Sequence, residues 1–176
     1  KFIGIPQWWG GVAKQWGSHF KGGQMSRDMT LFKDDDGTAY HVFASEDNST
    51  LHVAELTRDY LDYSGRWWRA AESQWTEAPA VCKKDGWYYI LHAEGGTGPA
   101  HAVCVARSKE IYGPYEGNLM NPIITHRHLG KDYPIRYVGH ADLIEDTEGN
   151  WYAVMLASRP CEWHTNLGRE TFLAKV

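Results

Sequence analysis

The chain of 176 residues repeats one pattern three times, and this repetition restricts its fold more than any other feature. The copies align without gaps as "DMTLFKDDDGTAY" from Asp28, "EAPAVCKKDGWYY" from Glu77 and "HADLIEDTEGNWY" from His140. In every copy a polar residue is followed by apolar residues three and four places later, a glycine nine places later and a tyrosine twelve places later. A repeat of this kind indicates one supersecondary unit that the fold uses several times.

Each copy predicts two strands joined by a turn that contains the glycine. A third strand is predicted after the first copy, from "TLHVAEL", and after the second, from "HAVCVARS". The copies begin 49 and 63 residues apart, which is close to the length of a four-stranded propeller blade. Helical periodicity is almost absent, and "SKEIYGPYE" predicts a short turn at most. We therefore expect an all-β fold, a β-propeller in preference to a β-sandwich, whose strands would not need the same polar start.

The first residues of the three copies are the candidate site. In a propeller the first strand of each blade lines the central channel, so Asp28, Glu77 and His140 should converge there. Two carboxyl groups in one cavity suit cleavage of a glycosidic bond, for which one of them must hold a proton. Glu77 precedes Ala and Pro, and this apolar setting favours the protonated form, whereas Asp28 follows a cation, Arg27, that favours the ionised form. The alternative is that both acids are solvated strand ends and that His140 is structural.

Composition and motifs narrow the class of protein further. A net charge of -4 gives no electrostatic footprint for nucleic acid, and no apolar run approaches the 18 residues of a membrane span. The spacing of the three cysteines fits no metal-binding motif, and their odd number argues against a complete disulfide framework. The compartment stays undecided, with a secreted or periplasmic location favoured over a cytoplasmic one. "DDDG" at 34–37 is interpreted as a turn between strands, because it lacks the other ligands of a calcium loop.

With these residues in view, the chain resembles glycoside hydrolase family 43. The resemblance rests on "SRDMTLFKDDDGTAY", "TEAPAVCKKDGWYYILHAEGGTG", "VARSKEIYGPYE", "NPIITHR", "VGHADLIED" and "LGRET". It implies a five-bladed β-propeller, of which residues 1–176 form one incomplete domain with about three blades and part of another. It also implies inverting hydrolysis of terminal β-xylosyl or α-L-arabinofuranosyl residues in oligosaccharides from plant polysaccharides. "SRDMTLF" and "YHVFASEDNSTLHVAELTRDYL" are similar instead to the exo-β-1,3-galactanase branch.

The resemblance also implies roles for single residues. Glu77 of "TEAPAV" corresponds to the general acid, and Asp28 of "SRDMTLF" to the residue that orients this acid and tunes its pKa. His140 of "VGHADL" corresponds to the channel centre, where some members hold calcium through water, and Arg169 of "LGRET" lies near the sugar. No cofactor is required, and a structural calcium at the axis is the one ion expected.

Two neighbours of the acids, Arg27 and Trp75, are assigned to substrate binding. Trp8, Trp9 and Trp16 either present a sugar platform or belong to a core.

The chain departs from the family pattern at the general base. The family places this Asp well ahead of the residue matched by Asp28, but no acidic residue precedes Asp28 here. We therefore expect the C-terminal portion of a longer enzyme, weakly active by itself. Two alternatives remain: a propeller that binds glycans without cleaving them, and a phosphorylase that would use the basic cluster "THRHLGK" at 125–131.

Overall fold

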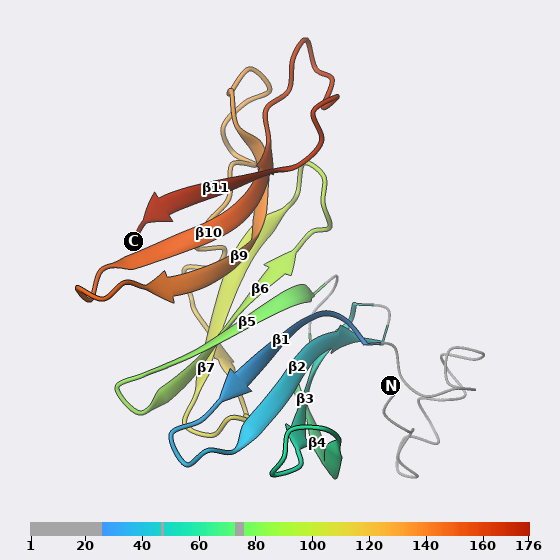
Figure 1. Ribbon diagram of the computed structural model, residues 1–176. Coiled ribbons are helices and arrows are strands. Elements are labelled where there is room, and N and C mark those ends of the chain that lie inside the picture. The colour runs from blue at the N-terminus through green and yellow to red at the C-terminus, as the bar shows by residue number, and fades with distance from the viewer. Residues whose placement is uncertain (1–25, 47, 73–75) are drawn as a thin grey trace.

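The computed structural model describes residues 26–46, 48–72 and 76–176. The described residues contain eleven strands and no helix, which confirms the expected all-β class (Figure 1). The predicted third strands form β3 (Thr50–Leu56) and β7 (Ala102–Ser108) almost within the predicted bounds.

The strands form three antiparallel sheets, and one repeat copy opens each sheet. The first sheet has the order β1 (Arg27–Lys33), β2 (Ala39–Ser45), β3, β4 (Tyr63–Glu72). The second has the order β5 (Glu77–Lys84), β6 (Trp87–Glu94), β7, β8 (Glu116–Gly117). The third contains β9 (Arg136–Glu145), β10 (Trp151–Ser158) and β11 (Glu170–Lys175), with β10 in the middle. Sequence analysis did not identify β4, β8 and β11.

The turns of the three repeats differ in length. β5 and β6 are joined by Asp85 and Gly86, both with positive φ, 52° and 71°. This is the backbone of the tight two-residue hairpin that Asp-Gly favours. The other two repeats close through the longer loops 34–38 and 146–150, in which the backbone N–H of the glycine donates to the carbonyl of Asp34 or Asp146. "DDDG" therefore forms part of the turn that its position in the repeat predicts.

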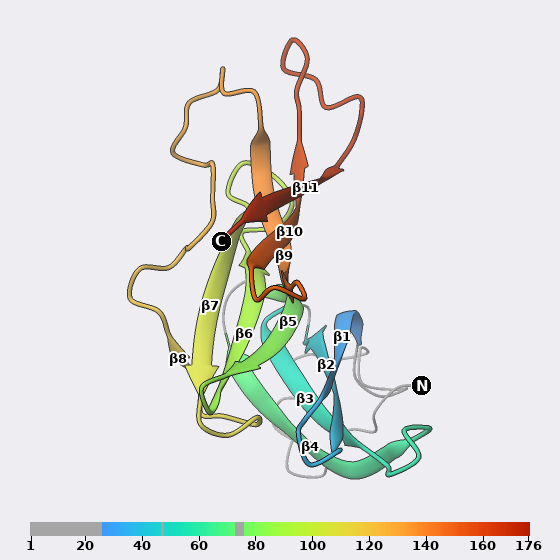
Figure 2. The same ribbon diagram turned by 60° about the vertical axis from the view of Figure 1, so that its left-hand side comes forward.

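The second sheet lies between the other two, with a hydrophobic cluster on each of its faces (Figure 2). The neighbouring β6 residues Ile90 and Leu91 point to opposite faces, as the two-residue period of a strand requires. Ile90 packs with Val42 and Val53 of the first sheet, and Leu91 packs with residues of the third sheet such as Val138. Burial of each such side chain stabilises the fold by about 1.5–3 kcal/mol.

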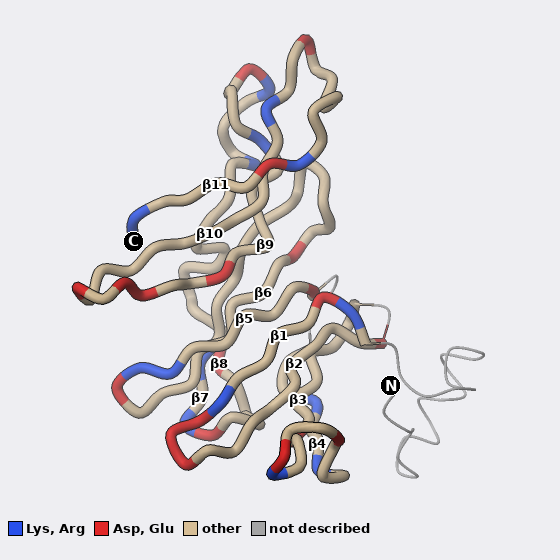
Figure 3. Tube along the Cα trace, viewed as in Figure 1, with Lys and Arg blue, Asp and Glu red and all other residues tan. Residues whose placement is uncertain are grey.

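The charged residues lie mainly on the turns, loops and strand ends, and residues of both signs occur there (Figure 3). Lys83 and Tyr88 of the second sheet both donate hydrogen bonds to Asp34, in the loop that joins β1 and β2 of the first sheet. No helix that could span a membrane occurs among the residues described.

Candidate active site

The strands β1, β5 and β9, which carry the predicted residues Asp28, Glu77 and His140 near their starts, lie next to one another. β5 packs against β1 on one side and against β9 on the other (Figures 1 and 2). Each strand is interrupted near its start by a β-bulge, at which two residues face one residue of the neighbouring strand, and β9 has a further bulge between Arg136 and Gly139. The bulge that the three strands share has a positive φ at its first residue: 46° at Asp28, 53° at Ala78 and 50° at His140.

The bulges correct the alignment of the repeats by one residue. Asp28, Ala78 and His140 occupy the same position in the three bulges. Glu77 stands one residue before its bulge, as Arg27 does in β1. The gap-free sequence alignment had placed Glu77 level with Asp28 and His140. The difference arises because the hairpin with the two-residue turn is one residue shorter between bulge and glycine.

Glu77 has the most defined surroundings of the predicted acids. Its residue is only 7% exposed, and the adjoining Ala78 is buried, as the apolar sequence context predicts. Its Oε2 accepts hydrogen bonds from Arg27 Nη2 at 3.1 Å and from Asn48 Nδ2 at 3.0 Å. Its Oε1 accepts no hydrogen bond from any residue that the structure describes. One carboxyl oxygen is thus held by protein donors, and the other is left for a further partner.

The Arg27 guanidinium contacts Glu77 and makes no ion pair with the adjacent Asp28 within the described residues. We expected this cation to favour the ionised form of Asp28 and assigned it to substrate binding, and that second assignment stays a prediction. The structure pairs its guanidinium with Glu77, in the next sheet. Successive residues of a strand point to opposite faces, so adjacency in sequence does not bring Arg27 and Asp28 together. The Asp28 carboxylate makes no hydrogen bond or ion pair with the described part of the chain.

His101 is a site residue that sequence reasoning missed. Its ring is 1% exposed, and Nδ1 lies 2.9 Å from the carbonyl oxygen of Tyr137, so Nδ1 carries the proton that is donated. Its Nε2 is buried without a hydrogen-bond partner among the described residues. A lone His before an apolar strand gives no sequence signal for such a position.

Three predicted residues lie near enough to this imidazole for their charges to act on it. Burial lowers the pKa of His101, and the nearby charges of Glu77, His140 and Arg169 also act on it. The structure therefore brings Glu77, His140 and Arg169 into one region around a buried ring. Gly139 allows the close packing, because a Cβ at this position would lie 2.3 Å from His101 Nε2.

The remaining predictions have separate outcomes. Trp75, Trp8, Trp9 and Trp16 lie outside the described residues. Within the described ranges, no three His, Cys, Asp or Glu side chains come together as a set that could hold a metal ion. Within those ranges the residues around His140 provide no direct ligand set, and a calcium ion held there through water stays a prediction.

Comparison with known proteins gives a consistent result. A family model described as "Glycosyl hydrolases family 43" matches residues 12–176. A xylosidase/arabinosidase of Butyrivibrio fibrisolvens is 50% identical over 162 residues, which cover 85% of this chain and 31% of that protein. The chain thus spans about a third of the length of this curated relative.

Solved structures of the same family share the fold. The xylan β-1,4-xylosidase of Bacillus halodurans is 34% identical, with a TM-score of 0.78, over 85% of this chain and 31% of that one. A GH43 β-1,3-galactosidase solved with galactodeoxynojirimycin is 31% identical, with a TM-score of 0.69, over 97% of this chain and 48% of that one. The all-β sheets, the motifs and these matches agree, and the chain belongs to glycosyl hydrolases family 43.

Proposed function

We propose that this chain carries the proton-donating part of a glycoside hydrolase site that releases terminal pentosyl residues by an inverting mechanism. The substrates would be β-xylosides or α-L-arabinofuranosides at the non-reducing ends of oligosaccharides from plant polysaccharides. The three sheets would then be consecutive blades of a five-bladed propeller, with the channel along the starts of β1, β5 and β9.

One observation carries this proposal: the asymmetry of the two Glu77 oxygens. A general acid must present one oxygen with its proton to the glycosidic oxygen while the carboxyl group keeps a fixed orientation. Arg27 and Asn48 hold Oε2, and Oε1 has no hydrogen-bond partner in the described chain. Oε1 is therefore the atom from which we expect proton donation to the leaving group.

The other residues around Glu77 have proposed roles in binding. Asp28 stands at the equivalent bulge of the neighbouring strand, and its carboxylate has no partner among the described residues, so it can accept hydrogen bonds from sugar hydroxyls or influence the acid across the channel. The exposed guanidinium of Arg169 can donate to sugar oxygens in a planar geometry. His140 would lie at the channel centre. A water-mediated calcium ion there remains a prediction.

The general base is not assigned to a residue of this chain. An inverting glycosidase needs a second carboxylate that activates water on the face of the sugar opposite the acid. No Asp or Glu occurs in residues 1–27, ahead of Asp28. This observation favours a second candidate function, in which the chain binds glycans without cleaving them.

A third candidate concerns the sugar. The GH43 β-1,3-galactosidase matches 97% of this chain, more than the 85% matched by the xylan xylosidase. This coverage agrees with the galactanase-like features between β1 and β4. A terminal galactosyl residue is therefore the alternative substrate.

The proposal is tested by product release from aryl β-xyloside, α-L-arabinofuranoside and β-galactoside by the chain and its Glu77→Gln variant. If Glu77 is the acid, the variant loses about 10²–10⁴-fold in rate on substrates with poor leaving groups. Substrates with good leaving groups need no proton, so they should lose far less. Glu116→Gln, in the exposed ion pair of β8 with Arg107, serves as the matched control and should leave turnover unchanged.

The outcomes separate the three candidates. Turnover that Glu77→Gln leaves intact on poor leaving groups would exclude the proposed acid. Saturable binding of an oligosaccharide without product from a folded chain would support the glycan-binding candidate. A preference for the β-galactoside would identify the galactosidase candidate.

A further inference from the structure

The turn between β2 and β3 holds two residues in a backbone conformation that side chains rarely adopt. Glu46 has a φ of 51° and Asn48 a φ of 62°, although neither is glycine. Such conformations cost free energy and persist only where surrounding contacts impose them. The turn is closed by Ser49, whose Oγ donates a hydrogen bond to the carbonyl of Glu46 at 2.6 Å.

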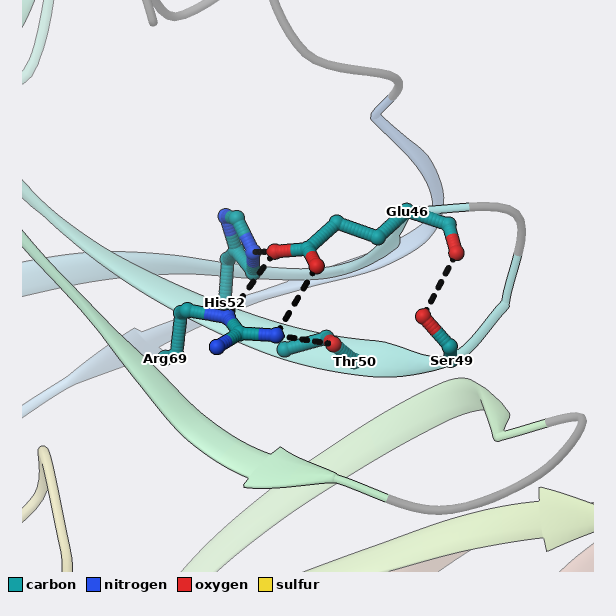
Figure 4. Close-up of polar contacts among 5 residues, drawn as sticks. All are labelled: Glu46, Ser49, Thr50, His52 and Arg69. Carbon is teal, nitrogen blue, oxygen red and sulfur yellow. Dashed lines mark hydrogen bonds and ion pairs between the residues drawn. The ribbon is translucent and has the colours of Figure 1, made fainter. Parts of the chain in front are cut away.

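A buried ionic cluster imposes this conformation (Figure 4). The Glu46 side chain is 1% exposed, and its carboxylate receives two hydrogen bonds of 2.9 Å from Arg69 of β4. His52 of β3 adds a third through Nε2, also at 2.9 Å. Arg69 in turn donates to Thr50 Oγ1 at 3.3 Å. Burial opposes ionisation of Glu46, but these donors outweigh it, and the pKa of the carboxyl is lowered. Since a buried carboxylate is stable only with such partners, β3 and β4 fix the turn in place.

The fixed turn presents Asn48 to the start of β5, in the next sheet. Its carbonyl accepts a hydrogen bond from the backbone N–H of Thr76 at 2.6 Å. Its side-chain Nδ2 donates to Glu77 Oε2 at 3.0 Å. Asn48 therefore contacts two successive residues, one through its backbone and one through its side chain.

Asn48 makes these contacts at a cost. Its Oδ1 is buried without a hydrogen-bond partner among the described residues, and its backbone keeps a positive φ. A buried acceptor without a partner is destabilising and calls for an explanation. The explanation is that the Asn48 amide must turn Nδ2 toward Glu77, so that Oδ1 points where none of the described residues offers a hydrogen-bond donor.

We propose that Asn48 is the positioning residue that holds the Glu77 carboxyl in one orientation, with Oε1 directed away from the protein donors. The cluster of Glu46, Arg69 and His52 keeps Asn48 in place. The proposal rests on the proposed function only for its effect on turnover, because the contact itself is a property of the folded chain.

Asn48 is a stronger determinant of this orientation than Arg27. The Arg27 side chain is 51% exposed, and solvent and salt weaken a pair with such a partner. Asn48 is 4% exposed, so its hydrogen bond to the carboxylate is shielded from water. The orientation of the acid thus depends on a turn of the first sheet, and no hydrogen bond between Glu77 and Asp28 occurs among the described residues.

The contact is tested directly by the side-chain amide signals of Asn48 in NMR spectra recorded against pH. The signals are identified by their disappearance in Asn48→Gly, a variant that suits the positive φ and removes only the side chain. In the chain itself these signals should shift as one carboxyl group titrates. In Glu77→Gln the shift should vanish. Signals that do not titrate, or that titrate equally in Glu77→Gln, would overturn the proposal whether or not the chain is active.

The effect on turnover is tested in Asn48→Gly against leaving groups. Misplacement of the acid should lower kcat about tenfold or more on an aryl glycoside with a poor leaving group, with KM and the rate on a good leaving group nearly unchanged. Asn150→Gly, in the turn between β9 and β10, is the matched control and should behave as the unchanged chain. Equal losses on both substrates would indicate a structural role and overturn the proposal. A chain without any turnover refutes the proposed function instead, and the NMR titration then decides the positioning contact alone.

Discussion

Gly139 is the position at which one methyl group should disturb the site most. It lies before the bulge of β9, where its Cα faces the buried ring of His101. In Gly139→Ala the new Cβ would stand 2.3 Å from both Cδ2 and Nε2 of that ring, and 2.5 Å from Cε1. These distances are far below van der Waals contact, so either the ring or β9 must move.

Neither movement is easy. The His101 ring is 1% exposed, and its Nδ1 is tied to the carbonyl of Tyr137 in the same strand as Gly139. Insertion of a methyl group into a packed interior costs typically about 1–3 kcal/mol, and we expect the upper end because the ring has no free space. For a chain of this size each kcal/mol lowers Tm by about 2–4 °C, so Tm should fall by about 6–12 °C.

The assay is urea and thermal unfolding followed by tryptophan fluorescence. Gly98→Ala is the control, because no atom lies within 4 Å of its added Cβ and its φ is ordinary; its stability should change by less than about 0.5 kcal/mol. The double variant Gly139→Ala/His101→Ala removes the clashing ring, so its loss should be smaller than the sum of the two single losses by about 1–3 kcal/mol. Equal stability of Gly139→Ala and Gly98→Ala, or strict additivity in the double variant, would refute the reasoning.

Three further predictions concern charged groups. Glu46→Ala removes the buried carboxylate to which Arg69 and His52 are hydrogen-bonded and should cost about 3–5 kcal/mol in urea unfolding, whereas Glu55→Ala, whose partner Arg66 is exposed, should cost less than about 1 kcal/mol. The folded pKa of Glu46 lies below its ordinary value of 4.5, so the stability that the ionised carboxylate contributes is present above that value and is lost as the pH falls through the folded pKa. Unfolding measured from pH 7 to pH 3 should show this loss of stability. The Glu46→Gln variant should not show it. Asp34→Asn should cost about 1 kcal/mol by weakening the link to Lys83 and Tyr88, and Asp35→Asn, on the same lysine but 86% exposed, should cost almost nothing.

The sequence was sufficient to predict the first two strands of each repeat and the polar residues near their starts. The polar start, the two adjacent apolar positions and the turn glycine recur at the same spacing in each copy, and this recurrence marks β1, β5 and β9. β8 has only two residues, which is too short for any periodic pattern. The register error at Glu77 has a similar origin, because spacing in sequence does not reveal how many residues a turn consumes.

The contacts of the site could not be predicted in the same way. "SEDNST", residues 45–50, has the composition of a solvated turn, yet Glu46 is 3% and Asn48 is 4% exposed. The partners that make this burial stable come from β3, β4 and the start of β5. Such partners are distant in sequence, and no local sequence pattern predicts them.

The placement of β5 between two hydrophobic clusters has a consequence for how this protein would evolve. Glu77 is held by donors from the first sheet, while His101 beside it packs against a strand of the third. The direction in which the Glu77 carboxyl points is therefore set by the angles at which the neighbouring sheets meet. Conservative substitutions in either cluster, such as Val42→Ala or Val138→Ala, would alter those angles slightly and leave every strand intact. Selection for a new leaving group or a new temperature optimum could then act through interior residues that never touch the sugar.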